Sequence, residues 1–468
     1  MKNIEINFDF LKIQNPWWNG DDMKYDPVID EFENQVIKYY SPEISKIKLN
    51  QDGIYGFFGA RGMGKTTMLK LFIRELLTVK KIKRENVFYY SCHNIISFEQ
   101  LNEFIKFFIR SRSEVFKNKE KLFIILDEIS LVKNWENGIK HLISAGLLKN
   151  VVLIFAGSVL AIKEKQFSKQ VVNVLKFNLS FKETISLLNA ELTKKEIDMK
   201  RYQEIAHSLE FYLDIYLLTG GLISALGSYR KLGFVKQRIY NDYLSWQQND
   251  VARMGRDIHL CQQILEQVII NFDKPVGHKT IAKKTKAKTH LTAGEYLKIL
   301  DNMLATKTIF QSDETGEPLR ASQKKIYFSN PFFFWTFYCH IHGSLNSWKY
   351  SRENLHKLDF YGYLINILIF NHLNRLSGVY DNECKVLFYR DSQNKKIIDF
   401  VVKKKSDTVA ILNCFNKNIT DKDIEFIKKT KFKKKIIISN QIMNLGQEIK
   451  IIPLTYFLLN YEKILQIK

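Results

Sequence analysis

Eight residues, GARGMGKT at 59–66, have the spacing G-x-x-x-x-G-K-[ST], which suits the binding of a phosphate chain. They follow the apolar run GIYGFF and open the helical pattern TTMLKLFIRELL. Glycines let successive backbone N–H groups surround the phosphates, and the start of a helix adds positive partial charge. We expect Lys65 to reach the β and γ phosphates and the Thr66 hydroxyl to bind Mg²⁺. The residues expected to contact the nucleotide are Gly59, Ala60, Arg61, Gly62, Met63, Gly64, Lys65, Thr66 and Thr67.

A pair of carboxylates ends the apolar run FIILDE further along the chain. Asp127 ends a predicted buried strand, where it can hold Mg²⁺ through water, and Glu128 is placed to polarise an attacking water as a general base. A later strand ends in FAGSVL, where Ser158 either hydrogen-bonds the γ-phosphate or the water, or is an ordinary turn serine. The predicted cofactors are ATP and Mg²⁺. The predicted catalytic residues are Glu128, Lys65 and Ser158, and the predicted metal ligands are Thr66 and Asp127.

Short apolar strands must position these residues. Helical patterns alternate with three short apolar strands, NVFYYSC, KLFIILDE and NVVLIFAGS. This alternation is typical of a parallel α/β sheet. From about Ser180 the pattern becomes helical. A small basic helical module follows at about 255–345, and another strand-rich region occupies about 350–468. The sequence therefore predicts a P-loop domain followed by further domains.

Composition agrees with several domains and narrows the class of partner. The chain has 468 residues, of which 46% are apolar, enough for several cores. Its net charge of +22, from 71 basic and 49 acidic residues, favours a polyanionic partner such as nucleic acid. The alternative is a lysine-rich composition of the kind that an AT-rich genome produces.

The compartment is also predicted from composition. Five scattered cysteines without a CxxC pair argue against a zinc ribbon or a disulfide framework and fit a reducing compartment. The sequence has no apolar run of the roughly 18 residues that a membrane span needs, and its N-terminus lacks the apolar core of a signal peptide. We therefore expect a cytoplasmic protein with no membrane partner.

The sequence resembles a family of archaeal and bacterial AAA+-like ATPases that carry a P-loop domain, a winged helix and a C-terminal nuclease-like domain of the PD-(D/E)xK type. The resemblance covers nearly the whole chain. It rests on NPWW, GARGMGKTT, FYYSC, LDEISLVKNWENGIKHL, AGSVL, NLSFKE, LLTGGL and IDFVV. It implies a P-loop ATPase domain at 1–185, a helical lid at 186–254, a winged helix at 255–345 and a restriction-endonuclease-like α/β domain at 346–468.

The chain departs from the family before NLSFKE, where the family usually has an arginine. Here Lys169 and Gln170 occupy that region, so this stretch lacks the arginine with which a neighbouring copy would activate hydrolysis. Other parts of the resemblance leave alternatives open. Trp17 or Trp18 of NPWW either walls the adenine pocket or packs in the core, and Gly220-Gly221 is expected to allow close packing. The later candidates for the arginine are Arg201, Arg230, Arg253 and Arg256.

The module at 255–345 has the element order of a winged helix: helix, helix, turn, helix, then a hairpin. Between Lys274 and Thr308 there are eight lysines against Glu295 and Asp301. In such folds the second helix of the turn unit lies in the major groove, and flanking basic residues hold phosphates. We expect double-stranded DNA as a partner, held with little sequence specificity, although many winged helices only contact proteins. The predicted contacts are Lys283, Lys284, Lys286 and Lys288.

The C-terminal region keeps little of a nuclease site, which needs clustered carboxylates for a metal ion and a lysine. By the resemblance, the acids fall at Asn366, Ile397, Asp399 and Asn413, and the lysine falls at Phe415. Only Asp399 has the required chemistry. We expect this domain to be inactive as a nuclease and to act as a basic platform.

The main prediction is a Mg²⁺-dependent ATPase that acts as a nucleotide-driven switch on DNA. The alternative is a nucleotide-gated protein-interaction module that hydrolyses ATP weakly, and a third possibility is an active metal-dependent nuclease. A protein partner and a homo-oligomer are both compatible with this class of domain.

Overall fold

The computed structural model describes residues 8–21, 23–95, 97–112, 120–157, 171–376, 384–391, 393 and 396–466. The chain divides into two compact units, residues 1–176 and residues 177–468. We call them the first and the second unit. The predicted finer division of the chain into four domains stays a prediction.

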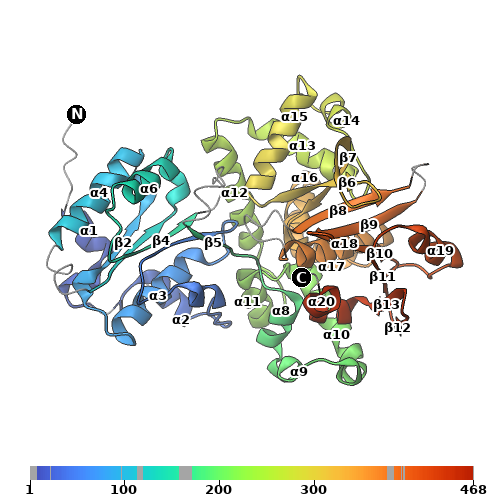
Figure 1. Cartoon of the computed structure of the whole chain (residues 1–468), viewed down its shortest axis with the longest axis horizontal. Helices are drawn as coiled ribbons and strands as arrows, with labels where there is room; N and C mark the ends of the chain where they lie inside the picture. The colour runs from blue at the N-terminus through green and yellow to red at the C-terminus, as the bar shows by residue number, and fades with distance from the viewer. Residues whose placement is uncertain are drawn as a thin grey trace. The chain divides into compact units, whose positions relative to one another are not determined.

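The first unit is built on a parallel sheet, as the alternating pattern predicts. Its strands run in the order β2-β3-β4-β1-β5, and every neighbouring pair is parallel (Figure 1). The strand that precedes the glycine loop and the strand that ends in Asp127 are therefore separated by one strand, β4. The strands are β1 (Gly53–Phe58), β2 (Val87–Ser91), β3 (Leu122–Asp127), β4 (Val151–Gly157) and β5 (Val172–Leu175).

Helices cover both faces of this sheet. Strand β3 shows why its sequence is apolar throughout: Phe123 and Ile125 face one core, and Ile124 and Leu126 face the other. One core includes α2 (Pro27–Glu33) and α3 (Lys65–Thr78), and the other includes α4 (Phe98–Ser111) and α6 (Trp135–Ser144). Short helices complete the unit: α1 (Phe8–Gln14), η1 (Pro16–Asn19), η2 (Pro42–Lys46), η3 (Arg84–Asn86), η4 (Cys92–Asn94) and η5 (Ile129–Leu131).

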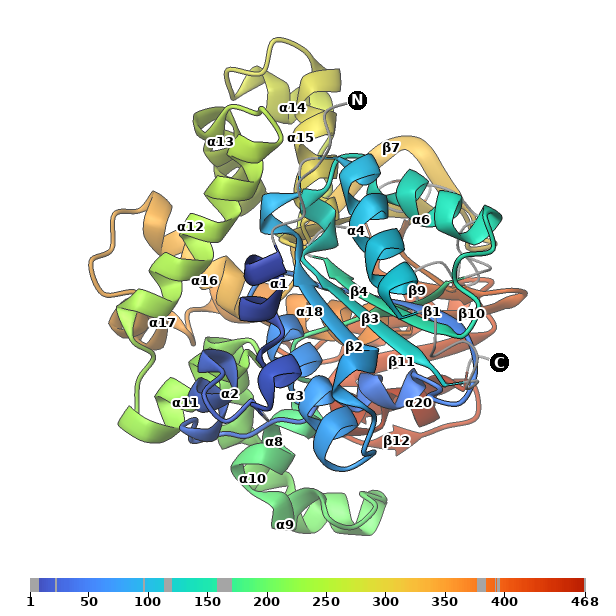
Figure 2. The same ribbon diagram turned by 90° about the vertical axis from the view of Figure 1, so that its left-hand side faces the viewer.

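The second unit begins with helices and continues into a large mixed sheet. Helices α13 (Ile258–Ile270), α14 (His278–Lys283) and α15 (His290–Asn302) lie side by side in both ribbon views (Figures 1 and 2). The other helices are α8 (Phe181–Leu188), α9 (Ala190–Thr193), α10 (Met199–Thr219), α11 (Ile223–Leu232), α12 (Gln237–Arg253), α16 (Pro331–Ile341), α17 (Ser347–Asn354), α18 (Leu358–Asn374), α19 (Asp421–Lys429) and α20 (Leu454–Leu465).

Eight strands form the sheet of the second unit, in the order β12-β13-β11-β10-β9-β8-β6-β7. Strands β10, β11 and β13 are parallel to one another, so their carboxyl ends meet at one edge. The strands are β6 (Thr306–Ser312), β7 (Pro318–Phe328), β8 (Cys384–Arg390), β9 (Ile397–Lys404), β10 (Asp407–Asn413), β11 (Lys434–Ser439), β12 (Asn444–Leu445) and β13 (Ile449–Pro453).

The hairpin of β6 and β7 belongs to this same sheet, because β6 pairs in parallel with β8. Its turn is acidic and forms ion pairs with lysines of β8, of β9 and of the segment before β11. Glu317 lies 2.5 Å from Lys403 and 3.6 Å from Lys385, and Glu314 lies 2.5 Å from Lys431. The hairpin that ends the basic helical module is thus continuous with the C-terminal strands.

A neutral histidine joins two helices inside the second unit. His372 of α18 is fully buried, and its Nε2 lies 3.1 Å from the backbone nitrogen of Phe181, which must donate. Its Nδ1 therefore carries the proton and donates to the Leu368 carbonyl at 2.8 Å. Burial, with a further contribution from Arg375, lowers the pKa of His372 to about 3.

This histidine gives the second unit a predicted pH dependence. Below its unfolded pKa of about 6.5, the unfolded chain binds a proton that the folded chain refuses, so stability falls as the pH drops from about 6.5 toward about 3. We expect the contribution to approach 1.4 kcal/mol per pH unit, about the value of one pKa unit. Urea unfolding of the wild type and of His372→Gln between pH 4.5 and 8 measures it. The glutamine variant should show a shallower pH slope, and equal slopes would contradict this role for His372.

Candidate functional site

The glycine loop connects the end of β1 to the start of α3. Gly64 caps α3 at a φ of 71°, in the left-handed region that favours glycine. Gly59 is required for a different reason: a Cβ there would lie 2.6 Å from the carbonyl oxygen of Lys176. The two glycines therefore fix the loop in a shape that keeps the backbone N–H groups at the start of α3 available to an anion.

Lys65 points back into its own loop. Its Nζ donates to the carbonyls of Gly59 at 2.7 Å and Ala60 at 3.0 Å, and the side chain is buried. Burial lowers the pKa of Lys65. Asp127 and Glu128 oppose this effect, while Arg61 and Lys176 add to it. A phosphate anion placed beside this ammonium would replace two neutral acceptors by a charged one, which makes a stronger hydrogen bond.

Asp127 lies at the end of β3, where the sequence places it, and it meets the start of α3. Thr66 Oγ1 donates to Asp127 Oδ2 at 2.6 Å, and the Asp127 carboxylate is 2% exposed. Tyr89 of β2 also donates to Asp127 Oδ2, at 3.2 Å. Burial raises the pKa of Asp127, while its hydrogen bond from Thr66 works against that rise. The structure thus brings together the two residues that the sequence predicts as metal ligands.

This pair fits a Mg²⁺ ion that is bound jointly with a nucleotide. Carboxylate and hydroxyl oxygens are the ligands that Mg²⁺ takes from proteins, with phosphates and waters completing the six positions. Among the described residues, no cluster of three or more acidic, histidine or cysteine side chains could hold a metal ion alone. Because Asp127 and Thr66 supply only two ligands, they suit a metal that arrives with phosphate oxygens.

Glu128 follows Asp127 in a strained conformation. Its φ of 53° and ψ of 39° are left-handed, which is uncommon for a residue with a side chain. Its Oε2 is buried and has no hydrogen-bond partner in the described part of the chain. Strained backbone conformations are concentrated at functional sites. A carboxylate oxygen without a hydrogen-bond partner can accept a proton, as a general base must.

Several predicted residues cannot be placed. Ser158, Lys169 and Gln170 lie outside the described residues. The strand before Ser158 is described: β4 runs between β1 and β3, and the carbonyl of its last residue, Gly157, accepts from the Gly59 N–H at 3.3 Å.

The tryptophans of NPWW belong to the core of the first unit. Trp17 is fully buried, and the indole N–H groups of Trp17 and Trp18 both donate to the Val87 carbonyl at 3.0 Å. Val87 is the first residue of β2, whereas the glycine loop follows the carboxyl end of β1. In a parallel sheet these are opposite edges, so the structure favours the packing alternative over an adenine wall.

The glycine pair also has a packing role, as expected. A Cβ on Gly221 would lie 2.4 Å from the Leu179 carbonyl, and one on Gly220 would lie 2.7 Å from Asn330. Two of the four arginine candidates form ion pairs within the second unit. Arg201 lies 2.9 Å from Glu204, and Arg256 lies 3.1 Å from Glu295. Which arginine acts on a phosphate stays a prediction.

Sequence reasoning missed Lys176. It follows β5, is 3% exposed, and its backbone N–H donates to the Phe58 carbonyl. Its Nζ hydrogen-bonds Ser41 Oγ and lies 3.8 Å from Glu43. The available signal was a lysine at the carboxyl end of an apolar strand, which is where a parallel sheet gathers its polar site residues. Tyr89, inside FYYSC, carried no comparable signal.

A second polar cluster lies in the second unit, around Asp399. The Nζ of Lys325, on β7, lies 3.1 Å from Asp273 and 3.4 Å from Asp399, and Lys325 is 1% exposed. Burial works against the charge of Lys325, but the two carboxylates outweigh it and raise its pKa. The Asn413 amide donates to Asn366 at 2.8 Å, and its backbone N–H donates to Asp399 at 2.9 Å. The aligned positions Asn366, Asp399 and Asn413 are therefore neighbours.

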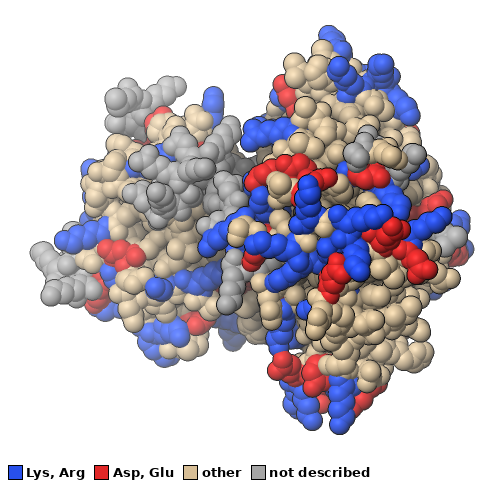
Figure 3. Space-filling view, turned by 45° about the vertical axis from the view of Figure 1, so that its right-hand side comes forward, with Lys and Arg blue, Asp and Glu red and all other residues tan. Residues whose placement is uncertain are grey.

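The predicted DNA-contacting lysines lie at one end of the second unit, on and after α14. Lys283, Lys284, Lys286 and Lys288 are all exposed. Within the described ranges none of the four makes a salt bridge. Figure 3 shows basic side chains at this upper end of the unit and a belt of mixed charge below it.

A strand, glycine loop and helix, with a hydroxyl and a carboxylate joined beside the loop, define a P-loop nucleotide-binding domain. Residues 51–185 match the family model described as AAA domain. This part of the chain is therefore similar to AAA domains.

Comparison with solved structures gives distant likenesses. Orc1 from Aeropyrum pernix in complex with DNA is 11% identical, with 61% of this chain and 86% of that one covered, at a TM-score of 0.30. RuvB, a Holliday junction branch migration motor from Thermotoga maritima, is 16% identical, with coverages of 60% and 89% and a TM-score of 0.29. No curated protein sequence matches the chain.

Among the described helices, no single one is long and apolar enough to cross a membrane. Helices α10 and α11, which meet at a 120° bend, have the necessary length and composition only when taken together.

The site predicts different outcomes for two substitutions. Lys65→Ala should abolish tight ATP binding, because it removes the cation at the phosphates. Glu128→Gln should keep ATP binding and reduce turnover by about 10²- to 10⁴-fold, the usual contribution of a general base. A fluorescent ATP analogue measures binding, and phosphate release measures turnover. Full turnover in Glu128→Gln would remove Glu128 from the catalytic role. Glu136→Gln, a change of another acid after the same strand, serves as the matched control.

Proposed function

We propose that the protein is a Mg²⁺-dependent ATPase that acts as a nucleotide-driven switch on DNA. The observation that carries this proposal is the 2.6 Å hydrogen bond between Thr66 and Asp127 beside Lys65, which gathers a metal-binding pair and a phosphate-binding cation at one sheet edge. Glu128 adds a buried carboxylate oxygen without a partner in the described chain.

The chain's own residues then have distinct tasks. The loop N–H groups and Lys65 orient the phosphates, and Lys65 leaves the carbonyls of Gly59 and Ala60 to do so. Thr66 and Asp127 would hold Mg²⁺, which supplies positive charge against the charge that develops on the transferred phosphoryl group. Glu128 accepts the proton of the attacking water through its free oxygen.

The basic module is proposed to be a winged helix. Supporting this, α13 is followed by a short bridge in which Val276 pairs antiparallel with Lys324, then by α14, α15 and the β6–β7 hairpin. The bridge has two hydrogen bonds, of 2.8 and 3.0 Å. In such a fold α15 enters the major groove and α14 flanks it.

DNA would be held mainly by phosphate contacts from this module. Four exposed lysines without salt bridges in the described chain suit the displacement of counterions from a phosphate backbone. The hairpin turn offers the opposite charge, and its Glu317 and Glu314 are paired with Lys403 of β9 and with Lys431, which precedes β11. We therefore infer that the helices, rather than the hairpin tip, contact the duplex.

The alternative is a nucleotide-gated protein-interaction module with weak hydrolysis. The observation in its favour is that Lys169 and Gln170 stand where the resembled family has an arginine. A homo-oligomer would be needed only if an arginine from a neighbouring copy completes the site.

The C-terminal region is proposed to be inactive as a nuclease. The Lys325 ammonium lies between Asp273 and Asp399, so it already neutralises the one surviving carboxylate of the aligned nuclease positions. A metal ion would have to displace a buried lysine from the second unit's core, and Asn366 and Asn413 supply no further charge to hold it.

Charge reversal tests the DNA proposal. Changing Lys283, Lys284, Lys286 and Lys288 together to glutamate should weaken duplex binding by at least tenfold and reduce its salt dependence, because phosphate contacts are lost. Any stimulation of ATP turnover by duplex DNA should disappear, while turnover without DNA stays at the wild-type rate. A matched control reverses Lys194, Lys195, Lys200 and Lys231, which lie elsewhere on the second unit. Unchanged duplex affinity in the α14 variant would overturn the DNA proposal.

The buried Lys325 is expected to stabilise the second unit. Lys325→Ala should lower the free energy of unfolding by about 3–5 kcal/mol, because two partly buried carboxylates lose their cation. The same change at Lys324, a neighbouring lysine without an acidic partner in the described residues, should lower the free energy of unfolding far less.

Neither the wild type nor Asp399→Ala should cleave DNA with Mg²⁺ or Mn²⁺. Metal-dependent cleavage by the wild type that Asp399→Ala abolishes would overturn the proposal of an inactive domain.

A further inference from the structure

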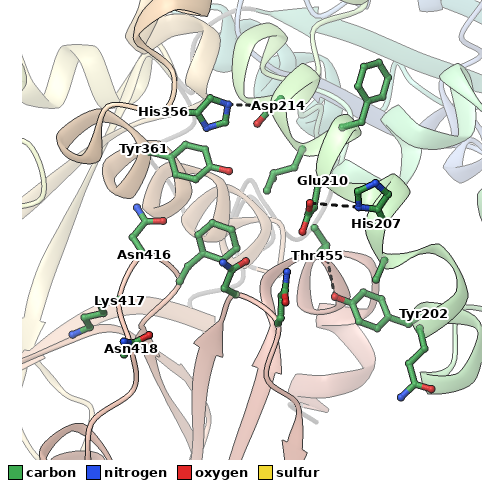
Figure 4. A pocket seen from close by; sticks show the side chains of 17 residues that line it. Tyr202, His207, Glu210, Asp214, His356, Tyr361, Asn416, Lys417, Asn418 and Thr455 are labelled. Atoms are coloured by element: carbon green, nitrogen blue, oxygen red, sulfur yellow. Dashed lines mark hydrogen bonds and ion pairs between the residues drawn. The ribbon is translucent and has the colours of Figure 1, made fainter.

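The second unit contains a cavity of about 1160 Å³ at the carboxyl ends of its parallel strands. One wall is α10, and the opposite wall is formed by the segments that follow β10 and β11 (Figure 4). Helix α20, which follows β13, contributes Thr455. Ligands of open α/β sheets bind in the crevice outside the carboxyl ends of the strands, and the volume exceeds the roughly 300–1,000 Å³ of ordinary small-molecule sites.

Carboxamide side chains are unusually frequent around this cavity. They are exposed, and none of them makes a side-chain hydrogen bond within the described residues. Each offers a donor and an acceptor side by side, which is the pattern that pairs with the edge of a nucleobase. The five are Gln203, Asn416, Asn418, Asn440 and Gln441.

Aromatic rings accompany the carboxamides. Tyr361 and Phe415 line the cavity with their ring centroids 5.9 Å apart and their planes at 53°, and each ring is partly exposed. Tyr202 lines the opposite wall and hydrogen-bonds Thr455 at 3.0 Å. Proteins recognise unpaired bases with two kinds of side chain: aromatic rings stack on the base, and polar groups hydrogen-bond its edge. This cavity offers both kinds.

Charge in the cavity argues against a site for phosphates alone. Glu210 and Asp214 line the cavity from α10 together with His207, which lies 4.0 Å from Glu210. Lys417 and His356 line it from other segments, and His356 lies 3.0 Å from Asp214. Carboxylates repel phosphates, but they accept hydrogen bonds from the amino groups of bases. The phosphate-binding lysines of α14 lie outside this lining.

We propose that this cavity binds an unpaired nucleobase, either as part of a single strand of nucleic acid or as a free nucleotide. One of the two rings, Tyr361 or Phe415, stacks on the base, and the other, inclined to it by 53°, contacts the base through its edge. The carboxamides of Asn440 and Gln441 hydrogen-bond the edge of the base. This site is separate from the duplex contacts on α14, and it does not rest on ATP hydrolysis.

The test uses the full-length protein and a fluorescein-labelled single-stranded DNA of 12 mixed nucleotides, followed by anisotropy at several salt concentrations. In Tyr361→Ala,Phe415→Ala the affinity should fall by roughly 5- to 150-fold, the range reported for loss of one base–aromatic stack. Asn440→Ala,Gln441→Ala should also weaken binding at least fivefold. In both variants the slope of affinity against salt should stay as in the wild type, because no phosphate contact is removed. Reversal of the α14 lysines should instead reduce that slope.

Matched controls are Phe234→Ala, an exposed ring, and Gln447→Ala, an exposed carboxamide; neither lines the cavity. Both should bind the probe as the wild type does. Thermal unfolding and ATP turnover without DNA, both at wild-type values, show that the cavity variants are folded. A stably folded Tyr361→Phe should retain binding because it keeps the ring.

Competition with deoxynucleoside monophosphates distinguishes the two sources of the base. Displacement of the probe at millimolar concentration assigns the site to free nucleotides, and displacement only by unlabelled single strands assigns it to nucleic acid. Cavity variants that bind the probe with wild-type affinity would overturn the proposal, as would a wild type that binds neither the probe nor the monophosphates. Neither result would contradict the ATPase proposal, because Lys65→Ala and Glu128→Gln test it without DNA.

Discussion

The direction of the strands is the constraint on which both candidate sites depend. Parallel strands bring their carboxyl ends to one edge, and there the chain leaves the sheet in loops that can hold polar side chains. In the first unit this edge carries the glycine loop after β1, the Asp127–Glu128 pair after β3 and Lys176 after β5. In the second unit the edge of β10, β11 and β13 carries the cavity.

Local strain and burial then adapt the edge of the first unit for chemistry. Glycine is needed at 59 and 64 because one position is too crowded for a Cβ and the other has a positive φ. Glu128 adopts a positive φ without being glycine. The surrounding sheet must stabilise that conformation, and the buried bonds around Asp127 supply part of the support.

The sequence was most informative where a motif and its structural context coincide. The strand, loop and helix around residues 59–66, and the strand that ends in Asp127, follow from spacing and apolar runs, because buried parallel strands need continuous hydrophobicity. Lys176 and Tyr89 could not be assigned in this way. Their roles depend on which strands are neighbours, and the order β2-β3-β4-β1-β5 is a long-range property. The same limit applies to Lys325, whose two carboxylates are distant in sequence.

The pairing of β6 with β8 has a consequence for how the chain can be divided. A fragment that stops before residue 346 would lack β8. The backbone N–H and C=O groups on that side of β6 would then be unpaired and able to hydrogen-bond a strand of another molecule. It would also remove the lysines of the C-terminal region that pair with Glu314 and Glu317. Self-association of such a fragment in solution would therefore reflect an unpaired sheet edge, not an assembly of the native chain.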